Sequence, residues 1–342
     1  MTDSETPRGR LLPAIRFRRR DRGDRPRPTR LRRLARSAVV IVAALTAASF
    51  GYNLATGPAP RPPGLPMLSA GGFDTRYRSW GTSGSPVVLV PGAFETADTF
   101  TALGAALGTD HRVFAIDLTG TGYSTPSPPF SAGHLADQLL AFLAAQGLTG
   151  ANAPVLVGHS SGAAVVGMAA LRGRARRGRR VASGIVFLDG DATPLAMPPA
   201  VGWLLINPYR TSILRLALSS DWLIRKVYDS QCGPACPRLS AAAVQTWRRP
   251  LEQPGFGSVI AYTLRYGIPS MTSAEFGRLR AERLPARVIV GADDPQLSRS
   301  AAAQAAGRIG APPPVVVPGR HLTMISSPGQ VAAAIRAFIR AT

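Results

Sequence analysis

A short apolar run, Val155–Val157, leads directly into a Gly-x-Ser-x-Gly pentapeptide centred on Ser160. This pattern needs a strand that ends in a sharp turn and a helix that begins at once, so that one hydroxyl stands above the edge of a sheet. Gly158 and Gly162 supply the small side chains that such a strained turn tolerates. The helix N-terminus would also present the backbone N–H of Ser161 to an oxyanion. Ser160 is therefore a candidate nucleophile, although the pentapeptide alone also fits an ordinary strand-to-helix turn.

From about residue 71 onward, short apolar runs alternate with helical patterns. The runs are rich in β-branched side chains and occupy Val87–Val90, Val113–Ile116, Val155–Val157, Ile185–Leu188, Val288–Val290 and Val315–Val317. Helical patterns between them include Leu135–Gln146, Gly162–Leu171 and Gln330–Arg340. This alternation predicts an α/β fold in which helices cover both faces of a mostly parallel sheet.

One interval interrupts the alternation. Between Leu188 and Val288 lie about 100 residues with helical patterns and no strand pattern, which predicts an inserted helical cap at about residues 195–284. Its segment Val201–Ile224 is markedly apolar. Two interpretations are open for this segment: a lid that lines a hydrophobic pocket and touches lipid, or helices that bury these side chains against their own core.

The N-terminal part differs in composition from the rest. Residues 1–36 hold 13 Arg against four acidic residues, a balance of +9 out of a formal net charge of +21, and we expect this tail to be disordered. Residues 37–57 carry no charge and, as a helix, would span about 30 Å, the thickness of a bilayer core. A Pro-rich linker follows at 58–69.

The arginines directly before residue 37 predict the orientation of this segment. By the positive-inside rule the tail stays cytoplasmic, residues 37–57 form a single-pass signal-anchor helix in the cell membrane, and the catalytic domain is extracytoplasmic. A cleaved signal peptide that releases a secreted protein is an alternative. A soluble helix with a nucleic-acid-binding tail is a third, but no aromatic residues or known motif accompany the arginines, so no nucleic-acid partner is expected.

The four histidines allow a general base to be chosen by elimination. His111 precedes a strand and so belongs to the edge opposite Ser160, while His159 lies inside the turn with its side chain directed away from Ser160. His134 begins a helix and no neighbouring feature marks it. His321 directly follows the last strand, at the edge where ligands bind in a parallel sheet, and is the candidate general base.

Such a base needs a carboxylate to fix its tautomer. Asp293 and Asp294 follow the Val288–Val290 strand, and Asp189 and Asp191 follow the strand before it, so both positions are candidates. Adjacent aspartates at a strand end are also ordinary turn residues.

A candidate oxyanion hole follows the Val87–Val90 strand. Gly92 allows the chain to turn tightly, so that the backbone N–H of Ala93 or Phe94 would face the same cleft as that of Ser161.

Taken together, these motifs resemble the α/β-hydrolase superfamily, from about residue 70 to the C-terminus. The matching segments, in order, are Asp117–Ser124, Gly158–Gly162, Gly291-x-x-Asp294 and Gly319-x-His321. The resemblance implies an α/β-hydrolase fold for a domain at 70–342, which follows the predicted N-terminal transmembrane helix. It also implies a triad in the family's order Ser160, Asp294, His321. It favours Asp294 over Asp293, with Asp191 as the fallback acid. Pro91 stands where many relatives carry His, which leaves the choice between Ala93 and Phe94 open.

The nucleophile narrows the expected chemistry. Relatives that open epoxides or cleave carbon–halogen bonds use Asp in the turn, so Ser160 argues for an acyl-enzyme mechanism without a metal or organic cofactor. We expect a cap-containing, esterase-like serine hydrolase that acts on small or lipid-like esters. A thioesterase, an amidase, a carbon–carbon bond hydrolase or a non-catalytic ligand-binding protein are the alternatives, and the oligomeric state is left open.

Two smaller features remain. Cys232 and Cys236 are the only cysteines, and no His lies near them in the sequence to complete a metal site, so an exported domain predicts a disulfide between them. An arginine-rich run at 172–180 predicts either a solvated distal face or attraction to anionic lipid.

Overall fold

The computed structural model describes residues 29–177, 180–195 and 206–342. It divides into two units, Met1–Ala48 and Ser49–Thr342. Helix α1 begins at Arg30 and ends at Ala55, so it starts seven residues before the predicted span and takes in the last arginines of the tail. Among the described residues it is the one helix long and apolar enough to cross a membrane. The predicted disorder of residues 1–28 lies outside the described residues.

The body of the protein contains an eight-stranded sheet with the order β1-β2-β4-β3-β5-β6-β7-β8. Strands β3 to β8 are parallel and confirm the six predicted runs. Their bounds are Pro86–Val90, Arg112–Ile116, Val155–His159, Gly184–Leu188, Ala286–Gly291 and Val315–Val317. The predicted fold class is therefore confirmed.

An antiparallel hairpin precedes the parallel strands and was not predicted. Strand β1 (Met67–Ala70) pairs with β2 (Phe73–Trp80), which in turn pairs with β4. Because β1 begins at Met67, the linker ends earlier than the predicted 58–69. The hairpin gives a weak pattern because its strands are only partly buried and β2 contains Arg76, whose buried guanidinium pairs with Asp98 and Asp117.

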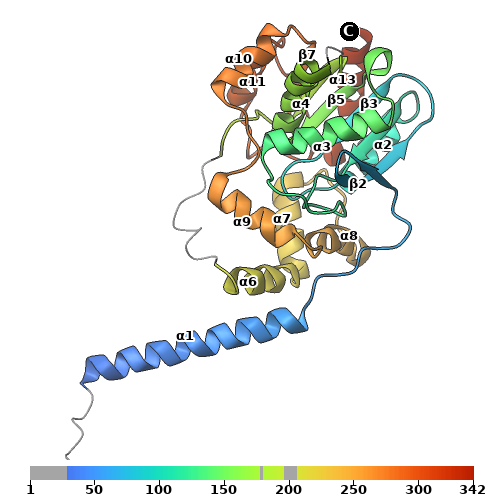
Figure 1. The fold of residues 1–342 in the computed structure, drawn as a ribbon. Coiled ribbons are helices and arrows are strands. Elements are labelled where there is room, and N and C mark those ends of the chain that lie inside the picture. The colour runs from blue at the N-terminus through green and yellow to red at the C-terminus, as the bar shows by residue number, and fades with distance from the viewer. Residues whose placement is uncertain (1–28, 178–179, 196–205) are drawn as a thin grey trace, which may run out of the picture. The chain divides into compact units, whose positions relative to one another are not determined.

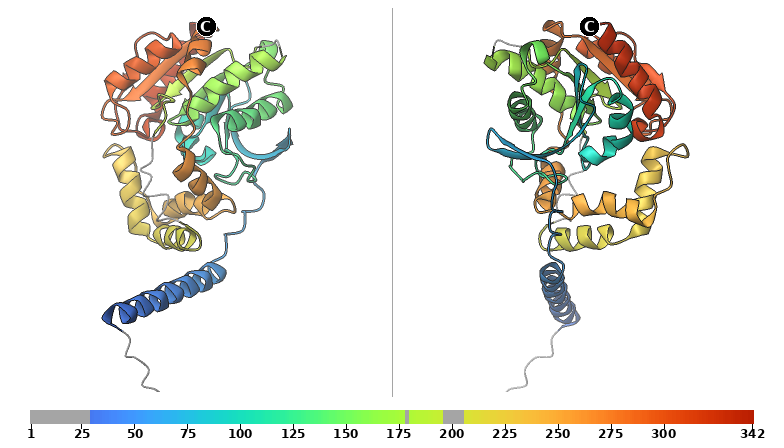
Figure 2. Two further views of the ribbon diagram at one scale, coloured as in Figure 1. Left: turned by 60° about the vertical axis from the view of Figure 1, so that its left-hand side comes forward. Right: turned by 90° about the vertical axis from the view of Figure 1, so that its right-hand side faces the viewer.

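Helices cover both faces of the sheet because alternate strand residues point to opposite sides. Val88 and Val90 pack in a core with α3 (Ala132–Ala145), α4 (Gly162–Arg177) and α11 (Arg299–Ile309). Val87 and Leu89 pack in a second core with α2 (Thr101–Leu107) and α13 (Pro328–Arg340). Figure 2 shows the green helices on one side of the sheet and the red α13 on the other.

A helical insertion lies between β6 and β7, as predicted. Its helices are α6 (Tyr209–Leu218), α7 (Asp221–Cys232), α8 (Ala241–Leu251), α9 (Phe256–Tyr266) and α10 (Ser273–Ala281). Figure 1 shows α6 to α9 grouped together below the sheet, whereas α10 lies beside α11.

The apolar segment of the cap was interpreted either as a lid over a hydrophobic pocket or as helices buried against their own core. The exposure of its side chains decides between the two only in part. Helix α6 buries none of its residues, and Ile213 and Leu216 are exposed, so burial in a core does not account for this helix. Helix α7 does bury Tyr228 and Cys232. The apolar residues at 201–205 lie outside the described residues.

The arginine-rich run at 172–180 begins inside α4, and side chains are described only at its two ends. The guanidinium of Arg172 donates hydrogen bonds to Asp137 (2.7 Å) and to the carbonyl of Gly133 (2.7 Å), so this residue ties α4 to α3. Arg180 is exposed. The side chains of residues 174–179 lie outside the description, and attraction of this run to lipid stays a prediction.

Candidate active site

Ser160 occupies the sharp turn that the pentapeptide predicts. Strand β5 ends at His159, Ser160 adopts a left-handed backbone conformation with φ of 49°, and α4 begins at Gly162. A Cβ atom on Gly158 would lie 2.3 Å from the Gly162 carbonyl oxygen, and one on Gly162 would lie 2.6 Å from the Val90 carbonyl oxygen. The turn therefore depends on both glycines, and it leaves Ser160 partly exposed above the sheet.

The predicted base and acid contact each other. His321, in the loop after β8, lies with Nδ1 2.9 Å from Oδ2 of Asp294, in the loop after β7. The other carboxylate oxygen of Asp294 accepts hydrogen bonds from the backbone N–H of Gln296 (2.7 Å) and Leu297 (3.0 Å). The carboxylate is fully buried, so it is fixed and directed at the imidazole. With Nδ1–H donated to Asp294, Nε2 of His321 is the nitrogen that can accept a proton.

The fallback acid is not in this arrangement. Asp191 accepts hydrogen bonds from the backbone N–H (3.0 Å) and the hydroxyl (2.6 Å) of Thr193, which is an ordinary turn contact. Asp293 is exposed. The choice of Asp294, which came from the resemblance, agrees with the geometry.

The serine is near these groups but is not hydrogen-bonded to them. The rings of His159 and His321 lie 4.9 Å apart, which places His321 beside the turn that carries Ser160. In the part of the chain that the structure describes, the Ser160 hydroxyl has no hydrogen-bond partner. Catalytic contacts of this kind are often long without substrate.

The remaining histidines lie as the elimination expected. His111 is bonded to Ser85 (3.1 Å) just before β4, at the opposite edge of the sheet. His134 contacts the carbonyl of Ser127 (3.0 Å). His159 points away from Ser160 and into the protein.

The loop after β3 passes directly beside the nucleophile. A Cβ atom on Gly92 would lie 2.8 Å from Cβ of Ser160, so only glycine fits this approach. The Gly92 N–H is already donated to Glu95, whereas those of Ala93, Phe94 and Ser161 bond to no group within the described residues. Phe94 has a positive φ of 66°. All three N–H groups stay candidates for the oxyanion hole.

Two further carboxylates lie at this edge: Glu95, which sequence reasoning missed, and Asp189, which it named only as a candidate orienting acid. Glu95 lies with Oε2 2.7 Å from Nδ1 of His159, whose Nε2 donates to the carbonyl of His321 (2.8 Å). Asp189 accepts hydrogen bonds from the N–H of Gly291 (2.8 Å) and from the hydroxyl of Thr323. No local pattern marks either pairing, although Asp189 directly follows β6 and Glu95 lies in the loop after β3.

Burial and neighbouring charges shift the pKa values of these three groups in different directions. Burial acts to lower the pKa of His159, but the adjacent carboxylate of Glu95 and its hydrogen bond outweigh it and raise the pKa to about 9. Burial acts to raise the pKa of Glu95, but the charge of His159 holds it below its ordinary value. Burial raises the pKa of Asp189 to about 6.

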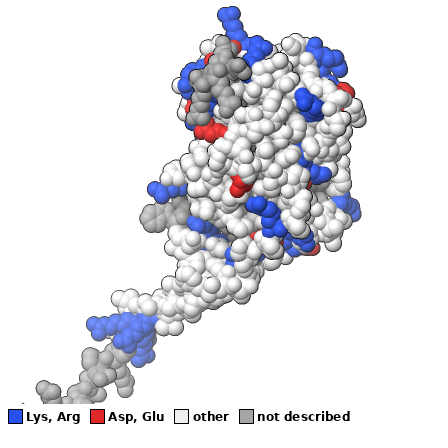
Figure 3. All heavy atoms as spheres, turned by 45° about the vertical axis from the view of Figure 1, so that its right-hand side comes forward, with Lys and Arg blue, Asp and Glu red and all other residues white. Residues whose placement is uncertain are grey.

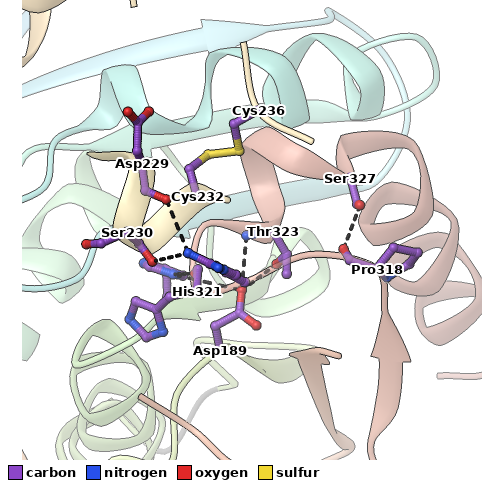
Figure 4. Close-up of a disulfide and its surroundings, with 11 residues drawn as sticks. Asp189, Asp229, Ser230, Cys232, Cys236, Pro318, His321, Thr323 and Ser327 are labelled. Atoms are coloured by element: carbon purple, nitrogen blue, oxygen red, sulfur yellow. Dashed lines mark hydrogen bonds and ion pairs between the residues drawn. A yellow bond between two sulfur atoms is a disulfide. The ribbon is translucent and has the colours of Figure 1, made fainter. Parts of the chain in front are cut away.

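The predicted disulfide between Cys232 and Cys236 is present at the end of α7. Figure 4 shows it above the loop that carries His321 and Thr323, with Asp189 below. The last carbonyls of α7 accept hydrogen bonds from this loop: the Ser230 carbonyl from Arg320 (3.2 Å) and the Gln231 carbonyl from the N–H of Leu322 (3.3 Å). The cap is thereby joined to the loop of the candidate base. The described residues contain no cluster of three His, Cys, Asp or Glu that could hold a metal.

A cavity of about 420 Å³ adjoins the loop after β3. The 3-10 helix Ala97–Phe100 and α2 form one wall, and α7 and α8 of the cap form the other. Its lining is mainly apolar and includes Phe94, Ala102, Tyr228, Leu239 and Trp247.

The parallel sheet, the strained serine turn, the Asp–His pair at the same edge and the helical insertion define the class of α/β hydrolases. The model of the Alpha/beta hydrolase family matches residues 87–334, nearly three quarters of the chain, and the chain belongs to this family.

Three known proteins show what the chain is similar to. N-formylmaleamate deformylase of Pseudomonas putida is 33% identical over 108 residues, which span 31% of this chain and 39% of the deformylase. A bacterial membrane phospholipase A has a TM-score of 0.63 at 18% identity, with 90% of this chain and 95% of the other covered. An esterase from Thermogutta terrifontis has a TM-score of 0.62 at 24% identity, with coverage of 81% and 97%. The two structures show the likeness of the fold.

Proposed function

We propose that the protein is a membrane-anchored serine hydrolase that cleaves carboxylic esters of small or hydrophobic acyl groups through an acyl-enzyme on Ser160. The observation that carries this proposal is the 2.9 Å hydrogen bond between His321 and a fully buried Asp294, at the sheet edge where the turn raises Ser160. This is the arrangement of nucleophile, base and orienting acid that activates a hydroxyl.

The mechanism follows from these positions. His321 Nε2 accepts the proton of Ser160 as Oγ attacks the ester carbonyl carbon, and the negative charge on the carbonyl oxygen is held by the N–H of Ser161 and that of Ala93 or Phe94. The carbon–oxygen bond to the leaving alcohol then breaks, and the alcohol takes the proton from His321. Water attacks the acyl-enzyme with His321 again as base, which releases the carboxylic acid and restores Ser160.

The cavity beside Phe94 supports a hydrophobic acyl group. Its apolar lining includes Phe94, one of the candidate oxyanion residues. We therefore expect an acyl chain bound there to have its carbonyl on the Ser160 side of the cavity. Transfer of apolar groups out of water stabilises binding by about 0.8 kcal/mol for each buried methylene. The unburied apolar side chains of α6 support the same class of substrate.

Helix α1 supports membrane anchoring. Its arginines, Arg30, Arg32, Arg33 and Arg36, gather at its N-terminal end, and no charge follows to Ala55 (Figure 3). A bilayer core needs about 20 apolar residues, which the uncharged part of the helix supplies. With the arginines on the cytoplasmic side, the catalytic domain would be extracytoplasmic, where a Cys232–Cys236 disulfide is stable.

Turnover of 4-nitrophenyl esters from acetate to dodecanoate tests the activity. We expect hydrolysis by the wild type, a loss of at least about 10³-fold in kcat for Ser160→Ala, and wild-type kcat for the matched variant Ser300→Ala on the exposed start of α11. Full activity of Ser160→Ala would exclude the proposed nucleophile.

Amide hydrolysis is the second candidate, favoured by the similarity to N-formylmaleamate deformylase. A thioesterase or carbon–carbon bond hydrolase would use the same groups. Comparing kcat/KM for an ester, a thioester and an amide with the same acyl group identifies the bond. A non-catalytic ligand-binding protein would turn over none of them and would not react with a fluorophosphonate.

A further inference from the structure

A second group of buried ionisable side chains lies beneath the proposed catalytic residues. His159, the last residue of β5 and directly before Ser160, is fully buried between two carboxylates. Glu95 Oε2 is 2.7 Å from its Nδ1, and Asp189 Oδ2 is 3.9 Å from its Nε2. Buried charges are costly unless they are paired, so the arrangement needs a physical reason to exist.

The hydrogen bonds fix the protonation of this group. Nε2 of His159 faces the carbonyl oxygen of His321 at 2.8 Å, and because a carbonyl only accepts, Nε2 carries a proton. Oε2 of Glu95 also accepts from the N–H of Gly92 at 3.0 Å, and the charge of His159 holds the pKa of Glu95 below its ordinary value, so Glu95 is assigned as a carboxylate that accepts from Nδ1. The raised pKa of His159 agrees with an imidazolium that donates from both nitrogens.

Each member of the group holds a different loop of the proposed site. Glu95 holds the N–H of Gly92, in the loop that supplies Ala93 and Phe94. His159 holds the main-chain carbonyl of His321. Asp189 holds the end of β7, where the acid loop begins, through the N–H of Gly291, and the loop after β8 through Thr323.

We propose that Glu95, His159 and Asp189 are positioning residues that lock the oxyanion loop, the nucleophile turn, the acid loop and the base loop into one geometry. The proposal rests on the proposed function, because its effect on rate exists only if Ser160 and His321 are catalytic.

A double-mutant cycle tests the central pair. Displacement of catalytic groups by about 1 Å can cost about 100-fold in rate, so we expect Glu95→Ala and His159→Ala each to lower kcat about 30- to 100-fold, with KM changed less than about threefold. The double variant should lose little more than either single variant, because the two residues act as a unit. Glu95→Gln, whose amide keeps one hydrogen bond to His159, should have a kcat about tenfold higher than that of Glu95→Ala.

The control is Asp110→Ala. It removes a carboxylate that pairs with Arg336 near the opposite edge of the sheet, and its kcat should equal that of the wild type. If Glu95→Ala or His159→Ala does not fold, as judged by circular dichroism, the cycle uses Glu95→Gln and His159→Gln.

Two further readouts separate this proposal from the proposed function. The second-order rate of Ser160 labelling by a fluorophosphonate needs no ester substrate, and hydrogen exchange of residues 92–96 and 321–323 needs no activity at all. A wild type that labels but cleaves no ester contradicts the ester assignment alone. Single variants that keep kcat, labelling rate and exchange within about threefold of the wild type overturn the positioning proposal, as do losses that multiply in the double variant.

Discussion

Asp294 and Asp191 both follow core strands at the same edge of the sheet, yet only one reaches His321. Asp294 accepts two backbone N–H groups with one oxygen and contacts the imidazole with the other, so its position is over-determined. Asp191 turns back to its own neighbour Thr193. Which aspartate at this sheet edge contacts His321 therefore depends on the conformation of its loop. The position of the aspartate along the chain does not determine it.

This difference gives a paired prediction. Asp294→Asn removes the charge that steadies the imidazolium and favours the wrong tautomer, and we expect kcat to fall by about 10³- to 10⁴-fold. Asp191→Asn should have a kcat within about threefold of the wild-type value. Steady-state kinetics on one 4-nitrophenyl ester measures both, and the opposite ranking would make Asp191 the orienting acid.

Protonation of His159 predicts a pH dependence of stability. Its pKa is about 9 in the folded protein and near 6.5 in an unfolded chain, so its stabilisation is complete below pH 6.5 and is lost as the pH rises through 9. The melting temperature of the wild type should therefore fall between pH 7 and pH 10. Glu95→Gln removes the carboxylate that raises this pKa, and its melting temperature should change less over the same range.

Scanning calorimetry at several pH values checks this dependence. Burial raises the pKa of Asp189 to about 6 in the folded protein. Its contribution to the free energy of unfolding is therefore lost as the pH rises through 6, below the range in which that of His159 is lost. An identical slope for wild type and Glu95→Gln above pH 7 would contradict the assignment of the imidazolium.

At the scale of elements, α7 links the cap to the chemistry. Its C-terminal carbonyls contact Arg320 and Leu322 on either side of His321, and the Gln231 side chain accepts a hydrogen bond from Gln296, two residues after Asp294. The disulfide closes the chain just beyond this end of the helix. A cap helix thus contacts both loops that hold the candidate acid and base.

Replacement of both cysteines by serine should loosen this end of α7. For such a short loop the chain-entropy model gives a loss of about 2 kcal/mol in the free energy of unfolding. We also expect kcat to fall several-fold, because the His321 loop loses its fixed neighbour. Denaturant unfolding and ester turnover measure the two effects, and wild-type values for both would show that the disulfide has no part in holding the loop.

The sequence predicted those elements whose patterns are local. The central strands β3, β5 and β6 are buried on both faces, which favours continuous β-branched runs, and the edge strand β8 was found from its three consecutive valines although Val316 is exposed. The β1–β2 hairpin was missed because its strands are half-exposed and β2 carries Arg76. Ser160 and His321 followed from the turn motif and the sheet edge, whereas the Glu95–His159 pair joins residues 64 positions apart, and only the folded chain brings them together.

At the scale of the whole molecule, the arrangement of charge along α1 predicts topology. A periplasmic-type reporter, active only outside the cytoplasm, fused after Thr342 should be active, and the protein should stay in the membrane pellet after carbonate extraction. A silent reporter, together with an active cytoplasmic one, would reverse the orientation. Release into the medium with a new N-terminus after about residue 48 would support a cleaved signal instead.

The proposed mechanism requires Ser160 to be an activated nucleophile. The most direct measurement is mass spectrometry of the purified protein after treatment with a fluorophosphonate. We predict a single adduct on the peptide containing Ser160, formed at least about 100-fold more slowly in His321→Ala, because the base that removes the hydroxyl proton is then missing. An unmodified Ser160, under conditions that fully label a known serine hydrolase, would contradict the proposed mechanism.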